Sequence, residues 1–73
     1  MKDELRSILK ESLDRETLVE ITENYEKYKD IELVDIGIDS LDYVAIISSI
    51  DDDIYEKIME LEKITLSEIN KML

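Results

Sequence analysis

The sequence has no cysteine and no histidine among its 73 residues. Without cysteine the chain can form no disulfide, no thiolate zinc site and no thiol nucleophile. Without histidine it lacks the usual general base and the commonest ligand of transition metals. We therefore expect that the chain is not an enzyme and that it holds no metal ion.

Proline is also absent, and Gly37 is the only glycine. Glycine adopts a positive φ more readily than other residues, so Gly37 marks the place where the sequence favours a sharp turn. The longest apolar run, residues 43–47, is far shorter than the roughly 20 residues that cross a bilayer. The first residues carry acids where a signal peptide needs basic and apolar side chains. We expect a cytoplasmic protein without membrane insertion.

Basic residues are few. The chain has nine Lys and Arg and twenty Asp and Glu, which gives a net charge of −11. Such an excess repels nucleic-acid phosphates and anionic lipids, so we expect no nucleic-acid partner. The excess is concentrated in residues 30–56, which hold nine acids and no base. Apolar residues make up 44% of the chain, which is typical of a folded core rather than of a disordered acidic tail.

The hydrophobic pattern predicts an all-α fold, a small bundle of three main helices plus one short helix, in a single domain over residues 1–73. A first helix is predicted over residues 2–14. Its apolar stripe consists of Leu5, Ile8, Leu9 and Leu13. Residues 15–38 are less regular and predict a long first loop with one or two helical turns that begin from a Thr17 cap.

The second helix is predicted to begin after Asp39, which is the predicted N-cap residue. Asp42 is predicted to lie in the first turn, where the helix dipole favours a negative side chain. The second helix is expected to run to the acidic residues 51–53 and to bury a broad face. Its apolar positions are Leu41, Val44, Ala45, Ile47, Ile50 and Ile54. The acids of residues 51–53 lack the spacing of a calcium-binding loop, so we expect no metal site there.

Two shorter helices are predicted in the C-terminal third. Apolar spacing indicates a brief third helix over residues 55–63. Thr65 and Glu68 have the spacing of a capping box, which predicts a last helix from there to near Leu73.

Ser40 is the residue of greatest chemical interest, because it lies on the predicted first turn of the second helix, after the Gly37 turn. First-turn side chains lie at the open end of a helix, so we expect an exposed hydroxyl. Ser40 cannot be the nucleophile of a catalytic triad, since the chain has no histidine to take its proton. It is either an ordinary helix-start residue or a substrate for modification.

Residues 37–42, Gly-Ile-Asp-Ser-Leu-Asp, followed by Val44, resemble the phosphopantetheine attachment motif of acyl carrier proteins. Residues 33–36 resemble the family's approach to this motif, and residues 62–66 resemble its entry into the last helix. The resemblance covers most of the chain and implies an acyl-carrier-like fold.

The resemblance also implies a carrier rather than a catalyst. A phosphopantetheinyl transferase would use Mg²⁺ and coenzyme A to attach 4′-phosphopantetheine to Ser40. The thiol of this arm would hold acyl groups as thioesters for the acyl-loading, condensing and tailoring enzymes of fatty-acid, polyketide or related biosynthesis. We expect the protein to act as a monomer.

Partner enzymes with basic patches are expected to dock on acidic and apolar side chains near the attachment serine. The predicted docking residues are Asp39, Leu41, Asp42, Val44, Asp51 and Asp52. The resemblance further implies a pocket for the acyl chain. The candidate pocket residues are Leu41, Val44, Ile47, Ile54 and Leu61.

Two departures from the pattern of fatty-acid carriers bear on the pathway. Ala45 stands where these carriers usually have Glu, and the usual Gly and Pro between the second and third helices are missing. A carrier of a polyketide, peptide or other specialised pathway is therefore a candidate, although Asp42 after Leu41 is closer to the acyl-carrier pattern than to that of a peptidyl or aminoacyl carrier. The alternative from another class is a helical adaptor of the same fold whose Ser40 is never modified.

Overall fold

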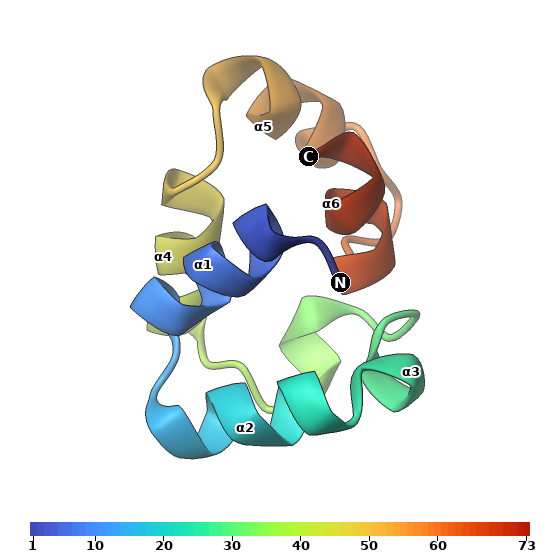
Figure 1. Ribbon diagram of the computed structural model, residues 1–73. Coiled ribbons are helices and arrows are strands. Elements are labelled where there is room, and N and C mark those ends of the chain that lie inside the picture. The colour runs from blue at the N-terminus through green and yellow to red at the C-terminus, as the bar shows by residue number, and fades with distance from the viewer.

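The computed structural model describes residues 1–73 and contains helices but no strand (Figure 1). The elements in chain order are α1 (Asp3–Ser12), α2 (Arg15–Glu23), α3 (Tyr25–Tyr28), the 3-10 helix η1 (Leu33–Asp35), α4 (Ser40–Ser48), α5 (Asp52–Met59) and α6 (Leu66–Met72). The prediction of a small all-α fold is confirmed. None of these helices has the length and apolar composition needed to cross a membrane.

The core is built around α1, which packs against both α4 and α2. Leu5 and Leu9 lie one turn apart on α1, and both are fully buried. The remaining buried apolar residues come from every part of the chain and are Leu13, Ile21, Leu33, Ile36, Ile38, Ile46, Ile47, Ile50, Ile58, Leu66 and Ile69. The N-terminal residues lie beside α6 in Figure 1, where the Lys2 backbone N–H donates to Asn70 Oδ1 at 2.8 Å.

The predicted long loop of residues 15–38 is wrong, because α2, α3 and η1 occupy most of it. Helix α2 is capped by Asp14 rather than by Thr17, since Asp14 Oδ1 accepts a hydrogen bond from the Thr17 N–H at 2.8 Å. Only Ile21 of this helix is fully buried. A helix that buries one residue leaves a weak periodic signal, which explains why the pattern predicted only one or two helical turns in this segment.

The boundary between the second and third predicted helices is also corrected. Helix α4 ends at Ser48, before the acidic residues, and α5 begins at Asp52 rather than at Tyr55. The hydroxyl of Ser49 donates to the Ala45 carbonyl at 2.9 Å, a bond that competes with the backbone hydrogen bonds of a helix. Asp51 therefore becomes the N-cap residue of α5, and Asp52 and Asp53 lie in its first turn, where negative side chains are favoured by the helix dipole.

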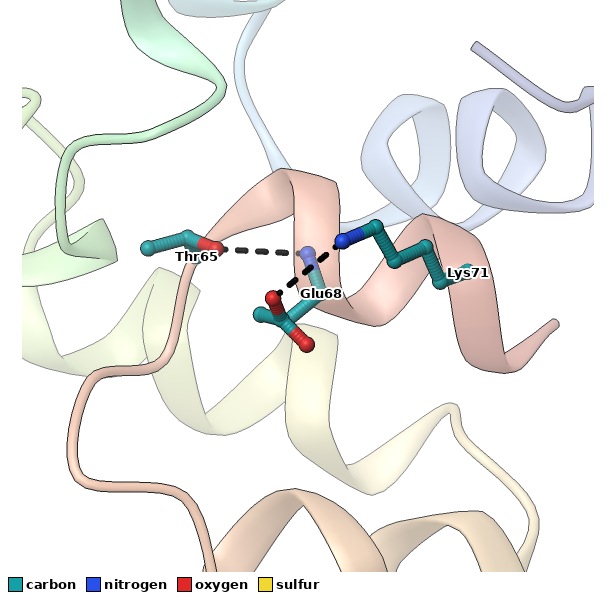
Figure 2. Close-up of polar contacts among 3 residues, drawn as sticks. All are labelled: Thr65, Glu68 and Lys71. Carbon is teal, nitrogen blue, oxygen red and sulfur yellow. Dashed lines mark hydrogen bonds and ion pairs between the residues drawn. The ribbon is translucent and has the colours of Figure 1, made fainter.

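The predicted capping box at the start of α6 is half formed (Figure 2). Thr65 Oγ1 accepts a hydrogen bond from the Glu68 N–H at 3.2 Å, as predicted. The Glu68 carboxylate pairs with Lys71 Nζ at 3.5 Å instead of returning to the cap. Thr65 also forms an isolated antiparallel bridge with Glu32, and the neighbouring Leu33 N–H donates to the Ile64 carbonyl at 3.0 Å.

Replacing Thr65 by Ala is expected to lower the free energy of unfolding by about 1 kcal/mol, since the Glu68 N–H loses its cap. Urea denaturation followed by circular dichroism measures the change. Ser7→Ala is the control, because Ser7 is exposed within α1 and its hydroxyl caps no helix. An equal loss in the two variants would contradict the assigned role of Thr65.

Candidate functional site

The site begins at the turn that leads into α4. Gly37 has φ of +86°, a conformation that side-chain-bearing residues rarely adopt, which confirms the turn predicted there. Asp39 follows in an extended conformation, and its Oδ1 accepts a hydrogen bond from the Asp42 N–H at 2.8 Å. The predicted N-cap is therefore confirmed, and it fixes where α4 begins.

Ser40 is the first residue of α4, and it is exposed. No hydrogen bond holds its hydroxyl, in contrast to Ser49 at the other end of the helix, whose hydroxyl is bound to Ala45. The open N–H groups and the dipole at a helix N-terminus favour an attached phosphate. An accessible, unconstrained hydroxyl at such a position fits the covalent attachment of a phosphopantetheine arm.

The carboxylate of Asp42, in the same first turn as Ser40, interacts with two other carboxylates. Partial burial, and then the charges of Asp39 and Asp14, raise the pKa of Asp42. A raised pKa means that the folded state disfavours the charged form, so Asp42 opposes folding above that pKa and the cost is relieved as the pH falls through it. Hydrogen bonds from Thr17 lower the pKa of Asp14, so its contribution stabilises the fold and is lost on acidification.

Two apolar side chains of α4 lie in solvent beside Ser40. Leu41 is 79% exposed and Val44 is 58% exposed, so the prediction that they contact the core is wrong. The buried side of α4 consists instead of Ile46 and Ile47, and Tyr43 is partly buried against the core. Leu41 and Val44 are three residues apart and so are neighbours on the helix surface. Exposed apolar side chains of this kind suit contact with a partner.

The predicted docking acids lie at both ends of α4. Asp39 caps its N-terminus and Asp42 lies in its first turn, whereas the exposed Asp51 and Asp52 follow its C-terminus at the start of α5. A helix of this length separates the two pairs by roughly 12 Å or more. No group of three or more acidic side chains is arranged to hold a metal ion.

A cleft of about 130 Å³ lies between α4, the η1 segment and the loop before α6. It is lined by Glu32, Leu33, Val34, Tyr43, Leu61, Glu62 and Ile64. Of the five candidate acyl-pocket residues, only Leu61 lines it. Leu41 and Val44 are exposed, Ile47 is buried in the core and Ile54 packs against the core. A second cleft, between α1 and the end of α4, contains none of the five.

Six residues that line the first cleft were not predicted from the sequence. The signal that could have identified Tyr43 is its spacing, since it lies three residues after Ser40 and one helical turn away. Glu32 and Val34 are brought to the loop before α6 by the bridge between Glu32 and Thr65, which has no signature in the sequence.

The sequence matches no model of a known protein family, and neither a curated protein nor a solved structure matches it. The features of the site therefore indicate the function. The site comprises an exposed serine hydroxyl at a capped helix start, exposed apolar and acidic side chains around it, and a small cleft one turn away.

Proposed function

We propose that this chain is an acyl carrier protein that bears 4′-phosphopantetheine on Ser40 and presents thioester-bound acyl groups to enzymes of fatty-acid, polyketide or related biosynthesis. The observation that carries the proposal is the exposed Ser40 hydroxyl at the first residue of α4, directly after the Gly37 turn and within a motif that resembles the attachment site. Because the chain has no cysteine, the sulfur for thioester chemistry would come from the arm.

In the attachment step this protein supplies only the Ser40 hydroxyl and its position. The Ser40 oxygen forms a bond to the phosphorus that carries the pantetheine part of coenzyme A. The pyrophosphate bond of coenzyme A breaks, the nucleotide part leaves, and the hydroxyl proton passes to a base of the transferase. Gly37 and the Asp39 cap serve this step by holding Ser40 at an open helix end.

The surface around Ser40 supports docking by basic enzymes. Leu41 and Val44 offer exposed apolar contact area, and Asp39 and Asp42 place negative charge beside it. Residues 30–56 contain no base, so a basic partner patch meets no repulsion along this stretch. Complementary charge of this kind raises association rates and excludes acidic partners.

Removing the charges of Asp39 and Asp42 together as Asn is expected to slow modification on the order of ten-fold at low salt. Asn caps a helix as well as Asp does, so folding should be nearly unchanged. The rate of mass gain with a phosphopantetheinyl transferase measures the effect, and added salt should shrink it by screening.

The matched control removes two exposed charges of α2, Glu16→Gln and Glu23→Gln, and leaves the surface around Ser40 intact. An equal slowing in both double variants would show that net charge alone, and not this surface, governs the encounter.

The function itself is tested by incubating the protein with coenzyme A, Mg²⁺ and a broad-specificity phosphopantetheinyl transferase. Intact-mass spectrometry should show a gain of one phosphopantetheinyl group. An unchanged mass would reject the carrier function and would favour the adaptor, which shares the fold but is never modified.

A further inference from the structure

The cleft beside α4 lies close to the proposed attachment site at Ser40. Tyr43 forms one wall of the cleft, and it lies one turn, about 5 Å, from Ser40 along the same helix. The fully buried Leu33 also lines the cleft, and so do Leu61 and Ile64 from the loop before α6. The hydrogen bond from the Leu33 N–H to the Ile64 carbonyl, at 3.0 Å, joins two of these lining residues.

The size of the cleft limits its occupant. An apolar cavity of roughly 150 Å³ accommodates benzene, which has six non-hydrogen atoms. The cleft, at about 130 Å³, therefore holds a group of similar or smaller size. A short acyl group of three or four carbons fits it, and a long alkyl chain does not.

The charge of the cleft limits the occupant further. Glu32 and Glu62 line it, and no basic residue does. Neither glutamate is in an ion pair, because the two ion pairs of the structure are Lys29–Glu26 and Lys71–Glu68. Burial raises the pKa of the Tyr43 hydroxyl, so this wall stays neutral, and aromatic rings attract cations. A cation is favoured here and an anion is repelled.

We infer that this cleft holds a short acyl group that ends in an ammonium, an amino-acyl cargo, on the arm at Ser40. The inference rests on the proposed function, since the arm is what brings the cargo to the cleft. The two glutamates would bind the ammonium, and the apolar walls would contact the methylene groups. A cargo that ends in a carboxylate would remain in solvent.

Three cargoes of equal length test the inference, namely β-alanyl, butanoyl and malonyl, which end in an ammonium, a methyl and a carboxylate. Each is loaded from its coenzyme A thioester by a phosphopantetheinyl transferase, and intact mass verifies the loading. Backbone amide NMR shifts at Val34, Tyr43 and Ile64 are then compared with those of the protein that carries the free arm. These residues line the cleft.

The β-alanyl shifts are expected to be about three- to five-fold larger than the butanoyl shifts, as weak, partly exposed ion pairs predict. Malonyl should cause almost none. Glu32→Gln with Glu62→Gln should reduce the β-alanyl shifts to the butanoyl level. The control Glu60→Gln, an exposed residue outside the cleft, should leave them unchanged.

Each other outcome is decisive. Larger shifts with butanoyl would show an apolar pocket and overturn the inference, and so would equal shifts with all three cargoes. Loading without any shift in the cleft would also overturn it while leaving the carrier function intact. A protein that takes up no mass from any thioester would overturn the proposed function, and the inference with it.

Discussion

The variant Ser40→Ala is expected to gain no mass at all with a phosphopantetheinyl transferase, because it removes the only atom that would accept the arm. Its melting temperature should match that of the parent, since Ser40 is exposed and its hydroxyl supports no hydrogen bond. Loss of modification in a folded variant would therefore report chemistry rather than stability.

Ser48→Ala is the matched control for this experiment. Ser48 is exposed and lies on the same helix, but at its last residue. This variant is expected to be modified at the parent rate. A mass gain in Ser40→Ala, or a loss in Ser48→Ala, would place the attachment elsewhere.

Leu9→Ala is expected to have the largest effect on stability. Leu9 is fully buried on α1, which packs against α4 and α2. Removing a buried leucine side chain costs about 2–5 kcal/mol, and domains of this size are stabilised by only about 4–11 kcal/mol in total. The variant should lose a large part of its resistance to urea, and chemical denaturation measures the loss.

Leu41→Ala removes the same atoms from an exposed position and is the control. Leu41 is 79% exposed, so the free energy of unfolding should change by no more than about 0.5 kcal/mol. The pair tests the orientation of α4, because a core position for Leu41 would make the two variants similarly unstable.

The features that the sequence predicts correctly are those that depend on neighbouring residues in the chain. The Gly37 turn, the Asp39 cap and the Thr65 cap all depend on interactions within a few residues, and the structure contains all three. The apolar stripe of α1 is equally local, since only one side of that helix is apolar.

The buried side of α4 shows where such reasoning fails. This helix is apolar on most of its circumference, so the period of the pattern does not determine which side faces the core. The structure buries Ile46 and Ile47 and exposes Leu41 and Val44, a choice made by packing against α1. The same exposed residues now serve the proposed docking surface rather than an acyl pocket.

The cleft beside α4 could not be predicted for a related reason. Besides Tyr43, its lining comes from residues 32–34 and 61–64, two segments about 30 residues apart in the chain that are joined by the bridge between Glu32 and Thr65, a tertiary contact. Local patterns carry no information about such a contact. The sequence does place Ser40 at a helix start, but the structure alone puts a cleft with two glutamates one turn away.

The central claim is that Ser40 carries the arm, and fragment mass spectrometry of the parent protein after treatment with coenzyme A, Mg²⁺ and a phosphopantetheinyl transferase tests it most directly. The account predicts one added phosphopantetheinyl group, found only on fragments that contain Ser40. Fragments with the added mass on another residue, or a protein without any added mass, would contradict it.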